Sequence, residues 1–173
     1  MRKRSVVLAI AIIGGALLVA SLAVAAGGKK NFKAGGLIGY EENPDISTVA
    51  IGSFRVTIDD AAQTLAYELS YSGLEGTVTQ AHIHFAKRAV NGGITLWLCG
   101  TATNPGPAGT PTCPQDGTVS RTVGVNDIVA PGTQGIEAMN FGELVQAMRA
   151  GRTYANVHSS KWTGGEIRAQ IND

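Results

Sequence analysis

The sequence predicts an all-β protein, an antiparallel Greek-key β-sandwich of the immunoglobulin-like or superoxide-dismutase-like kind. Two observations predict this fold class. Apolar and polar residues alternate with a period of two in several short stretches, as they do in strands with one buried face. Clusters of Gly, Asn, Asp and Ser separate these stretches, as turns separate strands. Many short strands joined by turns are typical of a sandwich or barrel.

Seven stretches carry the alternation. In residues 64–71, for example, every second residue is Leu or Tyr. In residues 48–59 the alternation slips by one position near Gly52 and Ser53, which predicts a β-bulge. The predicted strands are 48–59, 64–71, 77–85, 94–99, 118–123, 152–158 and 166–171.

One short helix is predicted near residues 141–150. Asn140 and Glu143 have the spacing of a capping box, in which two side chains satisfy the first backbone N–H groups of a helix. Gly151 suits the left-handed position that ends many helices. We expect this helix to cover one end of the sandwich.

The first 26 residues resemble a secretory signal peptide. Three of the first four residues are basic, residues 6–26 carry no charge, and small-residue cleavage sites lie at the end of this stretch. The alternative interpretation is an uncleaved membrane anchor, since about 20 apolar residues can span a bilayer. Both place the domain in a secreted or extracytoplasmic location. We expect residues 27–33 to be a linker and residues 34–173 to form one domain.

The charge balance excludes one class of partner. The chain carries 14 Lys and Arg against 13 Asp and Glu, and three of the basic residues lie in the predicted signal peptide. The remainder is therefore slightly acidic and has no basic patch, so we expect no nucleic-acid binding.

Cys99 and Cys113 are the only two cysteines. Outside the cytoplasm such a pair is most simply a disulfide. The alternative, two soft metal ligands, has less support because no histidine lies in the loop between them. Closing a loop of about 15 residues contributes around 3 kcal/mol in the chain-entropy model.

All three histidines lie in two of the predicted strands: His82 and His84 in residues 77–85, and His158 in residues 152–158. Side chains two positions apart on a strand share a face. The residues flanking His82 and His84 are apolar and belong against the core. The two histidines are therefore expected on the opposite, outward face.

The same alternation turns four further polar residues outward. Asn156 and His158 share one face of their strand, and Glu166 and Arg168 share one face of the last strand. A turn between these strands puts His158 opposite Glu166. It also puts Asn156 opposite Arg168, and opposed residues on one face have Cβ atoms about 5 Å apart. We expect one polar face that carries three imidazoles, a carboxylate, an amide and a guanidinium.

Two interpretations of this polar face stay open. In one, His82, His84 and His158 supply nitrogen ligands to a single copper or zinc ion, and copper would make the site redox-active. Glu166 is then a fourth ligand or an acceptor that holds a ring N–H in place. In the other, the same groups form a hydrogen-bonded polar network that fixes the strand register, with Glu166 paired to His158 or Arg168.

No catalytic constellation is evident. Ser159 and Ser160 directly follow His158, and adjacent residues on a turn rarely align a nucleophile with its base. Glu41 and Glu42 are interpreted as charges at the edge of the fold. An enzyme is therefore less expected than a binding or structural protein.

The chain resembles the CHRD (chordin) domain family. The residues that carry the resemblance are AHIH at 81–84, NGG at 91–93, YANVH at 154–158, GGEIRAQI at 164–171 and the opening LIGYEENP at 37–44. Two features depart from the family pattern, Ala169 in place of the usual glycine and the segment closed by the two cysteines.

The resemblance implies an extracellular all-β module. In the animal protein such domains accompany cysteine-rich domains that bind growth factors, and bacterial members are mostly secreted single domains. We therefore expect a binding or structural module whose partner is an extracellular protein or a surface ligand. Membrane contact is expected only through the N-terminal segment, if that segment is not cleaved.

A weaker resemblance links the histidine pattern to Cu/Zn superoxide dismutase, in which an HIH strand and a later VH strand hold copper on the outside of a Greek-key sandwich. This chain has no fourth histidine. A dinuclear site of that kind is therefore excluded, whereas a mononuclear site with three histidines is not.

Overall fold

The computed structural model describes residues 29–172, so the predicted signal peptide lies outside the described residues. The strands are β1 (Lys30–Ile38), β2 (Ile51–Asp59), β3 (Thr64–Ser72), β4 (Val78–Phe85), β5 (Gly93–Cys99), β6 (Gly117–Val123), β7 (Thr153–Ser159) and β8 (Ile167–Gln170). The helices are α1 (Phe141–Arg149) and two 3-10 turns, η1 (Gly39–Glu41) and η2 (Val125–Asp127). Among the described residues, no helix has the length and apolarity needed to cross a bilayer.

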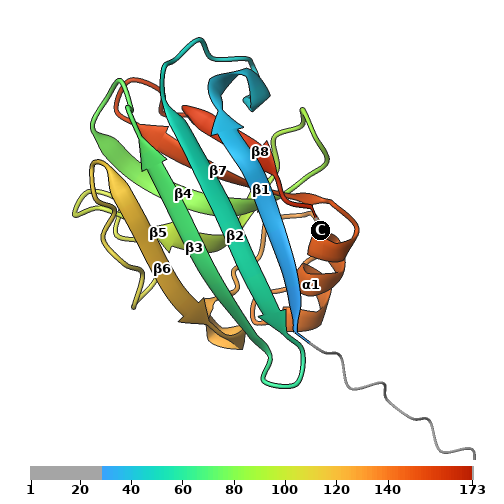
Figure 1. The fold of residues 1–173 in the computed structure, drawn as a ribbon. Coiled ribbons are helices and arrows are strands. Elements are labelled where there is room, and N and C mark those ends of the chain that lie inside the picture. Colours follow the sequence, from blue (N-terminus) through green and yellow to red (C-terminus); the bar gives the residue numbers. More distant parts are fainter. Residues whose placement is uncertain (1–28, 173) are drawn as a thin grey trace, which may run out of the picture.

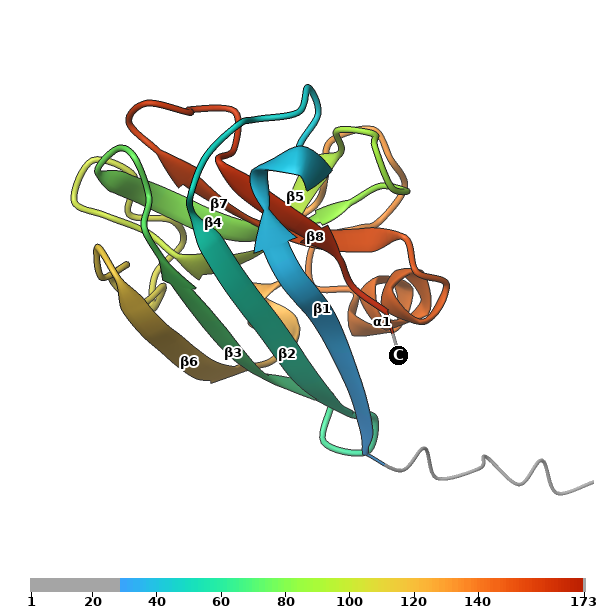
Figure 2. The same ribbon diagram turned by 45° about the horizontal axis from the view of Figure 1, so that its top comes forward.

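The eight strands form one continuous antiparallel sheet in the order β5-β4-β7-β8-β1-β2-β3-β6. The sheet folds back on itself, so that β1, β2, β3 and β6 form one layer and β4, β5, β7 and β8 form the other (Figures 1 and 2). The layers join where Ile38 of β1 pairs with Arg168 of β8. The predicted all-β class is confirmed, but the two layers belong to one sheet and are not separate sheets.

The core lies between the two layers. In β3, Leu65, Tyr67, Leu69 and Tyr71 are all buried, as their alternation predicts. The hydroxyl of Tyr67 donates a hydrogen bond of 2.6 Å to the carbonyl of Leu98 in β5, which connects the layers across the core. The apolar side chains of both layers form one cluster.

The bulge lies in a different strand from the one predicted. β2 pairs with β3 without interruption from Ile51 to Asp59. The irregularity is in β1, where the pairing with β2 shifts between Ala34 and Leu37. The apolar alternation of β2 slips because Ile51 faces solvent and is 60% exposed, not because the backbone bulges.

The first strand begins inside the predicted linker. Residues 30–33 belong to β1, and Phe32 and Ala34 are buried while the lysines beside them are exposed. The alternation is short, and the segment is mostly polar because it contains Lys30, Asn31 and Lys33. Apolar alternation therefore does not predict β1, and this strand begins before residue 34, the predicted start of the domain.

The predicted helix is confirmed as α1. The side chain of Asn140 accepts a hydrogen bond from the backbone N–H of Glu143, and Gly151 follows with a φ of 63°. The buried face of α1 packs into the common core, and the helix lies near the end of the fold where β1 begins (Figure 1). Arg149 in its last turn donates to Asp60 in the turn between β2 and β3.

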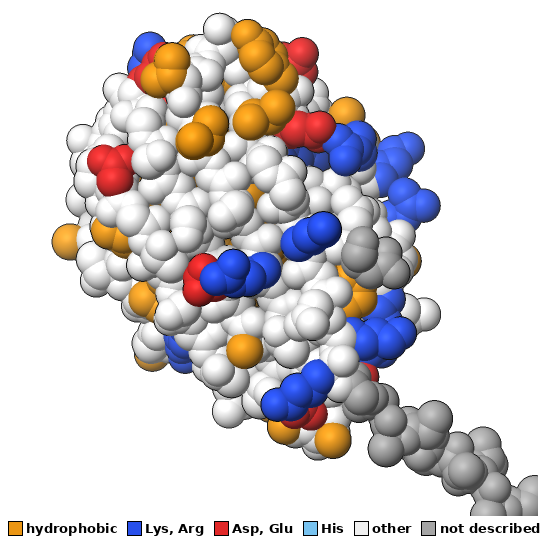
Figure 3. All heavy atoms as spheres, viewed as in Figure 1, with side chains coloured by type: hydrophobic (Ala, Val, Ile, Leu, Met, Phe, Trp, Pro, Cys, Tyr) orange, Lys and Arg blue, Asp and Glu red, His pale blue; other side chains and the backbone are white. Residues whose placement is uncertain are grey.

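Neighbouring charges of opposite sign lie on the surface in the view of Figure 3. One such pair in the β1–β2 layer joins Arg55 of β2 to Glu68 of β3. Exposed hydrophobic side chains gather at the upper end of the same view. The large exposed hydrophobic residues at the end of β1 and the start of β2 are Ile38, Tyr40, Val49 and Ile51.

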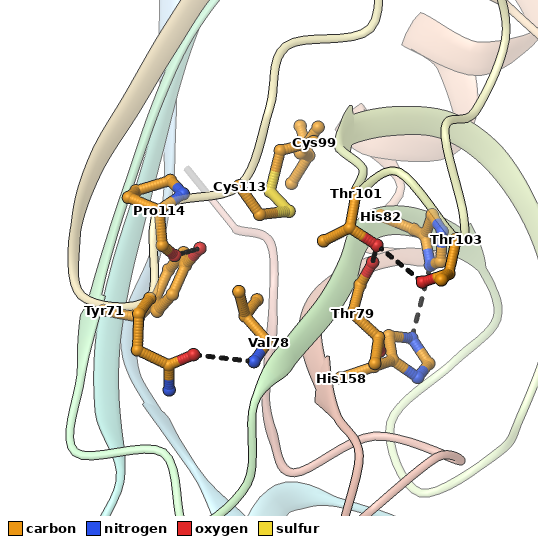
Figure 4. Close-up of a disulfide and its surroundings, with 12 residues drawn as sticks. Tyr71, Val78, Thr79, His82, Cys99, Thr101, Thr103, Cys113, Pro114 and His158 are labelled. Atoms are coloured by element: carbon orange, nitrogen blue, oxygen red, sulfur yellow. Dashed lines mark hydrogen bonds between the residues drawn. A yellow bond between two sulfur atoms is a disulfide. The ribbon is translucent and has the colours of Figure 1, made fainter.

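The predicted disulfide between Cys99 and Cys113 is confirmed, and it closes the long loop between β5 and β6 (Figure 4). Both cysteines are buried in the core cluster. The loop between them is rich in Gly, Pro and Thr and makes few buried contacts of its own. The disulfide therefore fixes a segment that burial alone would not order.

Replacing both cysteines with alanine should lower the free energy of unfolding by about 3 kcal/mol, because a loop of this length becomes free in the unfolded chain. Urea unfolding of the oxidised wild type and of the double variant measures the difference. A loss below about 1 kcal/mol would show that the loop is ordered without the disulfide.

Candidate metal centre

The three histidines meet on the face of the β4–β7–β8 layer that is turned away from the core. In the observed register His82 pairs with Asn156, and Asn156 pairs with Arg168 of β8. Ala81 and Ile83, on the other face of β4, are fully buried in the core. The ring centroids lie 5.3 Å apart for His82 and His84 and 5.0 Å apart for His82 and His158.

This outward face is itself buried. His82 is 0% exposed, His84 is 8% exposed and His158 is 6% exposed. Surface loops cover it, and two of them contribute hydrogen bonds to the rings, through the carbonyls of Gly92 and Thr163. The β4–β7–β8 layer is thus buried on both faces, apolar on one and polar on the other.

The ring nitrogens converge. One ligand atom from each of His82, His84 and His158 lies within 4.8 Å of the other two. The closest pair is Nδ1 of His82 and Nε2 of His158, 3.2 Å apart (Figure 4). Nitrogens about 2.0–2.1 Å from a shared ion lie at most about 4 Å apart, so the rings would have to move closer together than 4.8 Å to share one.

The partners of the rings assign their tautomers. Nδ1 of His84 lies 2.9 Å from the carbonyl oxygen of Gly92, and Nδ1 of His158 lies 2.9 Å from that of Thr163. A carbonyl oxygen only accepts, so both Nδ1 atoms carry the proton and both Nε2 atoms present a lone pair. Nδ1 of His82 then donates to Nε2 of His158.

The cluster has more acceptors than donors. Nε2 of His82 and Nε2 of His84 are buried and have no hydrogen-bond partner. Oδ1 of Asn156, another acceptor, lies 3.1 Å from Nε2 of His158. A buried polar group without a partner costs roughly 1–3 kcal/mol. A cation would satisfy such lone pairs, although Nδ1 of His82, the atom nearest His158, could bind it only after its proton has moved to Nε2.

The imidazoles are neutral. Burial lowers the pKa of His82 to about 2, with a further decrease from the neighbouring His158. Burial likewise lowers the pKa of His84 to about 4, and it lowers the pKa of His158. Neutral imidazole is the form that binds metal ions.

Arg168 ties the strands to the covering loop. It is 1% exposed and lies 3.3 Å from the centre of the Tyr154 ring, over its face. Its guanidinium donates to Oδ1 of Asn91 and to the carbonyl of Val90. The loop of residues 86–92 is therefore held by Arg168 on one side and by His84 on the other.

Glu166 is buried next to this face but makes its hydrogen bonds elsewhere. Its Oε1 accepts from the hydroxyl of Thr48 and from the backbone N–H of Glu75. Its Oε2 is buried without a partner. The close cluster of possible ligands in the described residues contains the three histidines and not Glu166.

Glu42 is a buried residue of this region that the sequence pattern does not single out. Glu41 is an exposed-edge charge paired with Arg88, as expected, but Glu42 is only 5% exposed. Burial raises the pKa of Glu42 to about 7, and the Arg168 charge and the nearby Asn156 side chain oppose this rise. Two adjacent glutamates give no sign of which one is buried; the E of the family's opening motif was the only available signal.

Comparison with known proteins identifies the family of this chain. Residues 35–171 match the CHRD domain model, and the chain belongs to that family. Searches among curated proteins and among solved structures found no match. The likeness to Cu/Zn superoxide dismutase therefore rests on the histidine pattern alone.

The ion-free protein should lose stability on acidification from pH 6.5 to pH 4.5. Unfolded histidines take up protons near pH 6.5, whereas the pKa values of about 2 for His82 and about 4 for His84 keep the folded rings neutral. Glu42 opposes this, because its pKa of about 7 lets the folded state bind a proton before the unfolded state does. Burial also lowers the pKa of His158, so three histidines outweigh one carboxyl and the slope is at least about 1.4 kcal/mol per pH unit, which corresponds to a net excess of one proton.

Urea unfolding of chelator-treated protein across this pH range measures the slope. His84→Asn should make the slope shallower, because it removes one of the three histidine titrations that destabilise the protein in acid. A stability that is constant or rises on acidification would contradict neutral, buried imidazoles.

Gly165 should tolerate no side chain. A Cβ at this position would lie 2.4 Å from Oε1 of Glu42, and its φ is 132°. We expect Gly165→Ala to lower the free energy of unfolding by about 1–3 kcal/mol. Gly164→Ala is the matched control, because no atom lies within 4 Å of its Cβ position. Equal thermal denaturation of both variants would show that Glu42 moves aside easily.

Proposed function

We propose that this CHRD-domain protein is an extracytoplasmic module that binds one copper or zinc ion through His82, His84 and His158. The surplus of buried lone pairs on one face carries the proposal. Two rings donate Nδ1–H to backbone carbonyls, which is how metal-binding histidines are commonly oriented, and so turn Nε2 toward the cluster.

The ligand chemistry narrows the class of ion. Three neutral nitrogens suit copper and zinc, whereas calcium and magnesium require oxygen ligands. The site is enclosed, and an enclosed site is typical of a structural or stored ion, because a catalytic ion keeps an open position for its substrate. An enclosed site therefore favours a protein that binds the ion over an enzyme that uses it in catalysis. Glu166, whose Oε2 is free, remains a candidate outer contact.

The proposed location outside the cytoplasm has three supports. The first 26 residues have the composition of a signal peptide or anchor. The buried disulfide fits an oxidising compartment. Domains of this family are typically extracellular. The partner protein or surface ligand of the module would be met there.

Protein prepared without a histidine tag should bind one equivalent of copper or zinc with submicromolar affinity in calorimetry. Each of His82→Ala, His84→Ala and His158→Ala should weaken binding at least 100-fold, more than the 10–100-fold typical of losing an outer contact. Glu166→Gln tests the fourth-ligand role, since a direct ligand would cause a loss as large as that of a histidine.

Trp97 gives an independent signal. Its ring centre lies 4.3 Å from that of His82, so copper(II) at the cluster should quench its fluorescence. Trp162→Phe removes the only other indole and leaves Trp97 as the reporter. Absence of heat with either ion, together with unchanged fluorescence, would reject metal binding and support the polar-network interpretation.

A further inference from the structure

A buried carboxylate from a distant segment reaches the histidine face. Glu42 follows η1, between β1 and β2, and belongs to neither of the strands that carry the histidines. It is 5% exposed, and its Oε1 has no hydrogen-bond partner. Burial raises the pKa of Glu42 to about 7, and the opposite charge of Arg168 and the side chain of Asn156 counteract this rise in part.

Asn156 connects this carboxylate to the imidazoles. Its side chain is 1% exposed and lies between Glu42 and the rings. Oδ1 faces Nε2 of His158 at 3.1 Å, and the opposite end, Nδ2, lies on the Glu42 side. The two ends of the amide differ, because Oδ1 carries lone pairs that favour a nearby cation whereas the Nδ2 NH2 group does not.

Gly165 makes room for this contact. A Cβ at residue 165 would lie 2.4 Å from Oε1 of Glu42 and 2.9 Å from Nδ2 of Asn156. The carboxylate and the amide nitrogen therefore share the space that a side chain would otherwise occupy. Strand pairing fixes the backbone of Asn156 between His82 of β4 and Arg168 of β8, so only the rotation of its amide remains to be decided.

We propose that Glu42 is a positioning residue of the metal centre, which holds the Asn156 amide with its oxygen toward the three histidines. A carboxylate accepts hydrogen bonds and does not donate them, so it selects the amide NH2 as its neighbour. The amide oxygen is then left facing the ion. This inference rests on the proposed metal binding and explains how an outlying segment contributes to it.

Reversal of the amide would oppose ion binding. The NH2 group would then donate to the lone pairs of His84 and His158 and place partial positive charge where the ion must lie. Glutamine at position 42 can donate as well as accept, so it no longer selects one amide orientation. Loss of an outer contact of this kind typically costs 10–100-fold in metal affinity.

The first test compares Glu42→Gln with Glu41→Gln in calorimetric titration with copper and with zinc. Glu41 is the matched control, because it is the neighbouring carboxylate but pairs with Arg88 at the surface. We expect Glu42→Gln to weaken binding at least tenfold and Glu41→Gln to leave it within threefold of the wild type. Equal affinities of the two variants would overturn the proposal.

A double-mutant cycle separates positioning from general damage to the fold. Asn156→Asp presents an oxygen in either orientation, so in this background Glu42→Gln should change affinity less than threefold. A purely structural role of Glu42 would cause the same loss in both backgrounds, and that result would contradict the inference.

A second pair of variants needs no change at Glu42. Asn156→Asp should bind the ion at least as tightly as the wild type, whereas Asn156→Leu, similar in size but without an oxygen, should bind at least tenfold more weakly. Equal binding by these two variants would overturn the role of the amide oxygen. Failure of the wild type to bind either ion would instead reject the proposed function itself.

Discussion

The pairing of β4 with β7 is the constraint on which the site depends. Its register sets His82 beside Asn156 and brings Nδ1 of His82 within 3.2 Å of Nε2 of His158. A slip of one residue would turn the histidines into the core and the apolar residues outward. Because apolar packing holds the inner face of these strands, the same burial that stabilises the layer also fixes the geometry of the polar face.

The polar face is unusual because loops bury it. Water cannot satisfy its ring nitrogens, so each must find a protein partner or remain unsatisfied. The carbonyls of Gly92 and Thr163 satisfy one nitrogen on each of two rings and, by doing so, leave the other nitrogen of each ring as a lone pair. Burial also keeps the imidazoles neutral. The surplus of acceptors follows from these facts together.

Strand alternation allowed much of this arrangement to be predicted. That His82, His84 and His158 share one face follows from the period of two and from the apolar residues on the opposite face of each strand. Alternation failed where composition masked it, as in the lysine-rich start of β1, and where an apolar residue faces solvent, as Ile51 does. In both cases the local pattern carried no information about what packs against the strand.

The sequence by itself determined the all-β class, the family, the single helix, the disulfide and the common face of the histidines, because each depends on local periodicity, on cysteine count or on contiguous motifs. Only the tertiary structure decided that this face is enclosed and that Glu42 joins it. Those outcomes depend on loops folding back from positions distant in the chain, such as the segment after β1. The path of a loop does not impose a regular spacing of apolar residues, so it cannot be predicted from the sequence pattern.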